Sequence, residues 1–317
     1  MPVQWAADLC WTFGRIDVRR LVAACAAAVL LLVGCSPQDP EPPEVVVTGE
    51  AGEAPTVTYR TPLRVAESLH EVVWPGSGPE LEDGRPVLLD FWLEDASDAT
   101  LVKESYSSSP TPRMLTEEDL GKDLYATLSG QRVGARLLQI SPASSASASS
   151  YPTVTVLDVL PTRAGGEAVA PREGMPVVTL DADGAPSIAP TGTEPPGDLV
   201  VQPLIRGTGD QVAEGDVITV QFTGFVWETG EPFDSTWTGK GPQTFSLADV
   251  PAWSEALVEQ AVGGQVMVVV PPSYPLGATQ SEELAGQTIV FVIDLLATRS
   301  PAADAPADAG TAAPEGD

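Results

Sequence analysis

Residues 214–235 read EGDVITVQFTGFVWETGEPFDS and decide the fold of the second half of this chain. A run of alternating side chains up to Phe222 and a turn at Glu228–Glu231 precede Phe233 and Asp234. This pattern predicts two β-strands that bring aromatic rings and one carboxylate to a shared cavity. No catalytic nucleophile accompanies them, so the stretch favours binding and distorting an apolar amide over cleaving it.

Shorter motifs follow this stretch in a fixed order. They are Gly241-Pro242, Phe245-Ser246-Leu247, Trp253-Ser254-Glu255-Ala256-Leu257, Val262-Gly263, Pro271-Pro272-Ser273-Tyr274, Gly277-Ala278 and the strand Thr288–Leu296. Together they resemble the FKBP-type peptidyl-prolyl cis-trans isomerases from Leu204 to Thr298. The resemblance implies an α+β fold, with an antiparallel sheet curled around one short helix. It also implies an enzyme that speeds rotation about X–Pro bonds without a cofactor or a metal.

The resemblance implies a pocket of eight residues, in which Phe222 replaces the usual tyrosine. They are Phe222, Phe233, Asp234, Phe245, Val250, Trp253, Leu276 and Phe291. Trp253 is the expected floor, and the backbone N–H of Val250 the expected donor to a substrate carbonyl. Each ring alone fits a core role as well, but the set with Asp234 favours a site. Leu276 stands where the family has a tyrosine donor, so we expect reduced rather than absent catalysis.

Similar residues recur along the chain at offsets of 129 to 136 residues. Matched pairs include Gly76-Ser77-Gly78 with Gly207-Thr208-Gly209, Phe91 with Phe222, Val133 with Val262, and Thr153–Leu160 with Ile289–Leu296. A nearly constant offset predicts two tandem FKBP-like domains, at residues 62–162 and 175–298, joined by a linker at 163–174. One large β-rich domain is the alternative.

The earlier copy lacks most of the expected pocket. Phe91 matches Phe222, but Val102-Lys103 stand where the second copy has Phe233-Asp234. Leu124 stands at the position of Trp253, and Thr155 at the position of Phe291. A Ser- and Ala-rich stretch at Ser141–Ser150 replaces the flap. We expect this domain to isomerise nothing and to act as a scaffold or a chain-binding surface.

Each copy has one predicted helix. In the first, Thr116 is a candidate cap with Asp119 three residues on, and Gly130 ends the helix. In the second, a helix opens near Asp249 or Ser254 and ends at about residue 261.

The N-terminus has the features of a targeting signal. Arg19-Arg20 precede the apolar run LVAACAAAVLLLVG, which is short for a membrane span. The run ends at Cys35, in a context that resembles a bacterial lipobox; an ordinary signal peptide or an uncleaved anchor is the alternative. We therefore expect a signal peptide at 1–34, lipid on Cys35, a disordered tether at 35–61 and a disordered tail at 299–317.

The charge of the chain limits its partners. The sequence has 16 Lys and Arg against 44 Asp and Glu, a formal net charge of -28. This excess argues against nucleic acid and against electrostatic adsorption to anionic lipid. Cys10 and Cys25 fall in the removed segment, so the mature protein is expected to have no disulfide.

These observations predict a monomeric, extracytoplasmic, lipid-anchored isomerase that acts on proline-containing exported polypeptides. The only histidine, His70, lies in the first copy, which excludes a histidine-dependent mechanism in the second. The rival hypothesis is a non-enzymatic chaperone or partner-binding lipoprotein of the same fold. A substrate-binding lipoprotein for transport is disfavoured, because the repeat lacks an alternating βα pattern.

Overall fold

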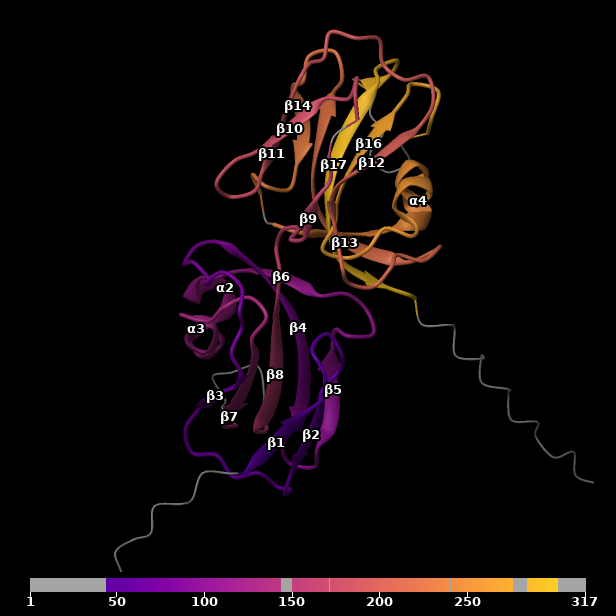
Figure 1. The fold of residues 1–317 in the computed structure, drawn as a ribbon. Coiled ribbons are helices and arrows are strands. Elements are labelled where there is room, and N and C mark those ends of the chain that lie inside the picture. The colour runs from indigo at the N-terminus through magenta and orange to yellow at the C-terminus, as the bar shows by residue number, and fades with distance from the viewer. Residues whose placement is uncertain (1–43, 144–149, 171, 240, 276–283, 302–317) are drawn as a thin grey trace, which may run out of the picture. The chain divides into compact units, whose positions relative to one another are not determined.

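The computed structural model describes residues 44–143, 150–170, 172–239, 241–275 and 284–301 (Figure 1). Within these ranges the chain forms two large sheets and two separate two-stranded hairpins. No helix among the described residues is long and apolar enough to cross a membrane. The predicted lipidation site Cys35, the flap residue Leu276 and the tail from 302 onward lie outside these ranges.

The first large sheet is antiparallel and has the order β3-β7-β8-β4-β5, with β6 paired to β4. Its strands are β3 (Leu69–Trp74), β4 (Pro86–Asp95), β5 (Thr100–Glu104), β6 (Thr111–Met114), β7 (Arg136–Ser141) and β8 (Thr153–Leu160). Helices α2 (Glu117–Leu120) and α3 (Lys122–Leu128) pack on one face of it through Leu120, Leu124 and Leu128. Burial of these apolar side chains stabilises this half of the protein.

The second large sheet has the order β14-β13-β17-β16-β12-β9, with β15 paired to β13. Its strands are β9 (Glu167–Ala168), β12 (Val200–Arg206), β13 (Val217–Val226), β14 (Pro232–Ser235), β15 (Gln243–Ser246), β16 (Gln265–Val270) and β17 (Ile289–Arg299). A 3₁₀ turn, η1 (Leu247–Asp249), leads into helix α4 (Pro251–Leu257). Helix α4 packs on one face of the sheet through Trp253, Ala256 and Leu257.

The two large sheets share a strand order and a register. In the first, Phe91 pairs with Leu157, and in the second Phe222 pairs with Ile293. Phe222 follows Phe91 by 131 residues, and Ile293 follows Leu157 by 136 residues. Both are offsets at which the sequence repeats. Equivalent side chains therefore face the helix in both sheets, because side chains alternate between the faces of a strand.

Each large sheet is preceded by a hairpin that covers its other face. The hairpins are β1 (Val45–Thr48) with β2 (Thr56–Tyr59), and β10 (Val177–Leu180) with β11 (Pro186–Ala189). Val47 and Val57 belong to an apolar cluster with the first sheet, and Val178 and Ile188 to one with the second. The expectation of a disordered tether over 35–61 is thus wrong for residues 45–59. The valines were overlooked because a four-residue strand gives only two apolar side chains to one face.

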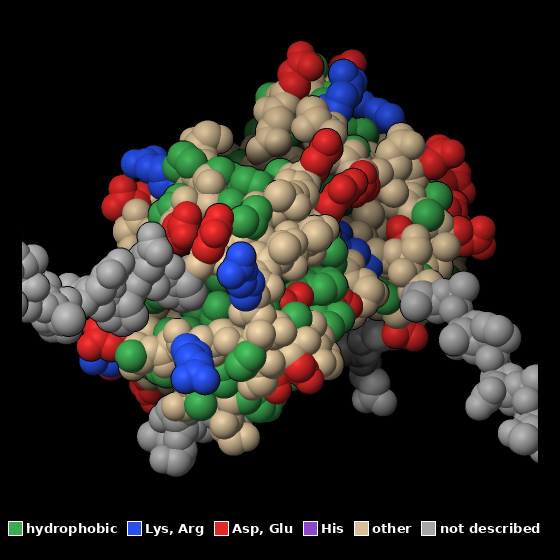
Figure 2. Space-filling view, turned by 90° about the horizontal axis from the view of Figure 1, so that it is seen from below, with side chains coloured by type: hydrophobic (Ala, Val, Ile, Leu, Met, Phe, Trp, Pro, Cys, Tyr) green, Lys and Arg blue, Asp and Glu red, His purple; other side chains and the backbone are tan. Residues whose placement is uncertain are grey.

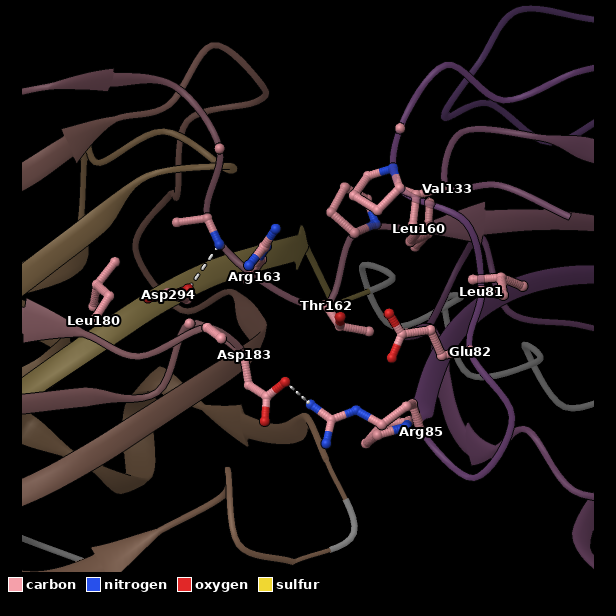
Figure 3. Close-up of a pocket in the computed structure, with 18 of the residues that line it drawn as sticks. Leu81, Glu82, Arg85, Val133, Leu160, Thr162, Arg163, Leu180, Asp183 and Asp294 are labelled. Carbon is pink, nitrogen blue, oxygen red and sulfur yellow. Dashed lines mark hydrogen bonds and ion pairs between the residues drawn. The ribbon is translucent and has the colours of Figure 1, made fainter. Parts of the chain in front are cut away.

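The segment at 163–174 is attached to the second sheet rather than being a separate joint. The N–H of Ala164 donates to Asp294 Oδ2 at 2.7 Å (Figure 3). Just before this segment, Gln221 Nε2 donates to the carbonyl of Thr162 at 2.9 Å. Strand β9 then pairs with the end of β12. Edge pairing satisfies backbone groups that an exposed strand leaves free.

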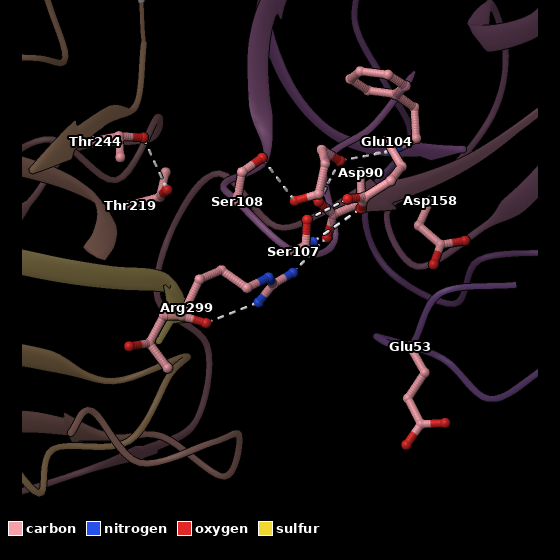
Figure 4. Close-up of polar contacts among 12 residues, drawn as sticks. Glu53, Asp90, Glu104, Ser107, Ser108, Asp158, Thr219, Thr244 and Arg299 are labelled. Carbon is pink, nitrogen blue, oxygen red and sulfur yellow. Dashed lines mark hydrogen bonds and ion pairs between the residues drawn. The ribbon is translucent and has the colours of Figure 1, made fainter. Parts of the chain in front are cut away.

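The C-terminal boundary also differs from the expectation, because Arg299 is the last residue of β17 rather than the first of a tail. Its guanidinium bonds Asp90 Oδ2 at 2.7 Å (Figure 4). Ser300 and Thr298 donate to the two carboxylate oxygens of Asp216 at 2.9 and 2.6 Å. These bonds hold residues 298–300 against the rest of the described chain.

The α+β class with one short helix in each domain is wrong. The described residues are mainly β-strand, and their α-helices span four, seven and seven residues. In the first half, Thr116 caps α2 as expected, but Gly121, at φ 74°, divides the helical segment into α2 and α3. In the second half, α4 ends at Leu257 rather than near 261, and Glu259 adopts a φ of 69°.

The acidic excess does not gather in one continuous patch on the face seen in Figure 2. Acidic and basic side chains lie there among apolar ones. On this face the charges therefore do not form a single electrostatic docking surface.

Candidate functional site

Five aromatic rings from five different elements form one cluster in the second large sheet. Neighbouring centroids lie 5.0–6.1 Å apart, and the ring planes meet at 65–89°. The rings are Phe222 of β13, Phe233 of β14, Phe245 of β15, Trp253 of α4 and Phe291 of β17. Edge-to-face contacts of this kind stabilise a cluster beyond the area that it buries. All five rings were predicted as site residues.

The rings differ in how open they are. Phe222, Trp253 and Phe291 are at most 1% exposed, whereas Phe233 and Phe245 are half-buried. Trp253 contacts three of the other four rings, at 5.0, 5.2 and 5.4 Å. The partly exposed rings are thus the ones available to a ligand, and the buried ones fix their positions.

Gly224 leaves space for the ring of Phe233, the outermost of the five rings. It lies opposite Asp234 in the β13–β14 register, and a Cβ atom built on it would lie 2.4 Å from Phe233 Cζ. Any larger residue would displace the ring, because real Cβ contacts are never that close. The signal in the sequence was a glycine inside a strand-forming apolar run, which marks a close approach.

Asp234 is exposed on β14, and its side chain lies at the edge of the sheet rather than in the buried cluster. Val250, by contrast, is fully buried, and its N–H donates to the carbonyl of Leu247 at 3.3 Å. This bond is long for N–H···O, so a closer acceptor from a ligand would compete well for the donor.

Thr236 is a supporting residue that the sequence did not reveal. Its Oγ1 accepts the N–H of Phe222 at 2.9 Å and lies 3.2 Å from Gln221 Oε1, to which it is placed to donate. Gln221 in turn holds the carbonyl of Thr162. The strand that carries the central ring is therefore bonded both to the loop after β14 and to the segment before β9.

A buried carboxylate lies on the opposite face of the same sheet. Asp294 of β17 accepts hydrogen bonds from Gln265 Nε2 at 2.6 Å and from the N–H of Ala164. Burial raises the pKa of Asp294 to about 6, although both hydrogen bonds and nearby Arg163 act in the other direction. Both hydrogen bonds hold neighbouring parts of the chain together. Among the described residues, no group of three His, Cys, Asp or Glu is placed to hold a metal ion.

Comparison with known proteins agrees with this geometry. The family described as FKBP-type peptidyl-prolyl cis-trans isomerase matches residues 209–296. A probable FK506-binding protein of Corynebacterium glutamicum is 37% identical over 103 residues, which are 32% of this chain and 87% of that protein. The chain belongs to the FKBP-type peptidyl-prolyl cis-trans isomerase family.

Two further relatives extend the comparison. An FK506-binding protein of Streptomyces anulatus is 30% identical and matches over 35% of this chain and 95% of its own length. The crystal structure of FkpA from Escherichia coli is 26% identical, covers 41% of this chain and 54% of its own, and has a TM-score of 0.31. The two relatives compared by sequence cover 32% and 35% of this chain, and the matched family region at 209–296 includes all five rings.

The first large sheet departs from the FKBP-type site at the equivalent positions. Its register pairs Leu93 with Lys103, where the second sheet pairs Gly224 with Asp234. Val102, which stands in the place of the outermost ring, is 45% exposed, and the ammonium of Lys103 lies 5.8 Å from the Phe91 ring centroid. A leucine fills the space that glycine leaves open, and a cation lies over the ring that is equivalent to Phe222.

Proposed function

We propose that this isomerase is lipid-anchored and extracytoplasmic, and that it speeds X–Pro isomerisation in exported polypeptides through the second large sheet. The observation that carries the catalytic part is the cluster of five rings at the positions that family resemblance assigns to the pocket. The half-buried rings of Phe233 and Phe245 would contact the proline of the client chain.

The proposed mechanism is non-covalent. Rotation about an X–Pro bond passes through a twisted amide, and the barrier is about 18–20 kcal/mol. The planar ground state is more polar than the twisted one, because resonance separates charge. An apolar wall of rings therefore raises the ground state relative to the transition state without an acid, a base or a nucleophile. The N–H of Val250 would orient the client carbonyl.

The first large sheet is proposed to be a second copy of the same fold that does not isomerise prolyl bonds. The shared strand order and registers support a common fold. Leu93, the exposed Val102 and the cation over Phe91 argue against a working pocket. A scaffold or a surface for partner chains is the role that these departures favour.

A protease-coupled isomerisation assay on the mature chain tests the catalytic proposal. The expected result is a rate above the uncatalysed background that Trp253→Ala and Asp234→Val both lower. A background rate with the protein folded, as judged by its near-ultraviolet circular dichroism, would instead support the rival function of a non-enzymatic binding module. Unchanged rates in both variants would place the pocket elsewhere.

The membrane anchor has a separate test. The wild-type protein should incorporate a labelled fatty acid, and Cys35→Ala should abolish this incorporation. Absence of label from the wild-type protein, or equal label in both, would contradict lipidation at Cys35.

A further inference from the structure

A groove of about 520 Å³ lies along the outer side of helix α4. Leu247, Ala248 and Pro251 line it next to Val250, and Val258 and Tyr274 complete the apolar part. The other face of α4 carries Trp253, the proposed floor of the pocket. Leu247 and Tyr274 also pack into the core that holds the five rings. The groove and the five rings therefore share one apolar core.

The polar lining of this groove is acidic. Glu214, from the loop before β13, and Glu255 of α4 are both exposed at it, with Ser254 as the remaining polar residue. Among the described residues, no lysine or arginine lines the groove. The Tyr274 hydroxyl donates to Glu255, so this carboxylate is tied to the residue that leads into the flap. A hydrogen-bonded carboxylate is held in place, which favours pairing with an incoming cation.

We propose that this groove binds the part of a client polypeptide that flanks the proline, and that it selects segments with a lysine or an arginine there. The inference rests on the proposed isomerase function. A client whose carbonyl bonds the Val250 N–H must pass close to Ala248 and Pro251, which line the groove. The aliphatic stem of a lysine or an arginine fits the apolar lining while its cationic head reaches Glu214 or Glu255. A client with acidic flanks meets like charge at the same place.

The test uses the mature chain and three short peptides that share one leucyl-proline bond. The peptides carry lysine, alanine or glutamate two positions before and after the proline. Exchange NMR gives the isomerisation rate of each without a coupling protease. We expect the lysine peptide to exceed the glutamate peptide in kcat/KM by about three- to fivefold at low salt, the range for exposed ion pairs. High salt should reduce this ratio towards one.

Glu214→Gln and Glu255→Gln remove the charges while keeping the shapes of the side chains. Glutamine at 255 retains an acceptor for the Tyr274 hydroxyl. The double variant should lose the lysine preference and keep its rate on the alanine peptide. Glu228→Gln, in the exposed turn between β13 and β14, removes one charge outside the groove and should leave the ratio unchanged.

The outcomes separate the two proposals. Catalysis of the alanine peptide with equal rates for lysine and glutamate peptides would overturn the charge selection and leave the isomerase function intact. A preference that survives the double variant would place the selecting charges elsewhere and also overturn this inference. Absence of catalysis on all three peptides would overturn the isomerase function itself.

Discussion

Gly224 of β13 lies against the ring of Phe233 on the neighbouring strand, with no room for a side chain between them. The equivalent residue of the first large sheet is Leu93. The glycine at 224 thus leaves space for the ring of Phe233, whereas the leucine at 93 leaves no such space in the first large sheet. Both residues sit in the same register of an antiparallel pair, so the side chain of Leu93 occupies volume that Gly224 leaves to the ring.

Gly224→Ala should therefore lower the isomerisation rate by about tenfold or more, which corresponds to about 1.4 kcal/mol in the barrier. The added methyl group displaces Phe233 from its contact with Phe291. Gly239→Ala is the control, because nothing lies within 4 Å of a Cβ atom there. Equal activity of both variants in the coupled assay would contradict a role for the Phe233 position.

Trp253→Ala should destabilise the second large sheet as well as impair catalysis. Its indole is fully buried and contacts Phe222, Phe245 and Phe291. Removal of a buried tryptophan costs about 3–5 kcal/mol of unfolding free energy. Denaturant unfolding followed by circular dichroism measures this cost. A loss below about 1 kcal/mol would mean that the ring cluster is loosely packed.

Asp294 should make the second large sheet more stable as the pH falls from neutral. Burial raises its pKa to about 6 in the folded protein, above the ordinary value of an unfolded chain. The folded state therefore binds this proton more tightly, and its stability increases as pH falls through about 6 towards 4. Asp294→Asn should flatten this dependence by up to roughly 3 kcal/mol. An equal dependence of the unfolding free energy on pH in the wild-type protein and in Asp294→Asn would refute the raised pKa of Asp294.

Arg299→Ala should destabilise the protein by leaving the buried carboxylate of Asp90 without its cation. Asp90 is fully buried, and burial already raises its pKa, while Ser105 and Arg299 act in the other direction. Loss of one partner of such a pair costs up to about 3 kcal/mol. Asp90→Asn in the same background should recover part of the loss, because it removes the uncompensated charge. Additive single-variant effects in a double-mutant cycle would show that the pair is not coupled.

A fragment that begins at Met175 should be less stable than one that begins at Thr162. The shorter fragment lacks β9 and uncovers Asp294, whose partner is the N–H of Ala164. Thermal unfolding of the two fragments, each ending at Ser300, measures the difference. Equal midpoints would mean that the segment before Met175 contributes nothing to the second sheet.

The aromatic rings that form the cluster could be named from the sequence, whereas the surroundings of each ring could not. The motif around Phe233-Asp234 and the later aromatics identify the family, and five of the predicted residues do form one ring cluster. Gly224 was overlooked, because its importance depends on a ring nine residues away across a strand pair. Thr236 was overlooked for a similar reason, since its hydrogen bonds reach back to β13.

The sequence by itself determined which residue types recur and at what spacing, because alternation and fixed offsets are properties of a linear chain. Only the tertiary structure decided what covers the outer faces of the sheets. The hairpin at Val45–Tyr59 has too few apolar residues to be recognised alone, and it is stable only against the sheet behind it. Likewise, Asp294 is an unremarkable strand residue until the N–H of Ala164 is brought to it.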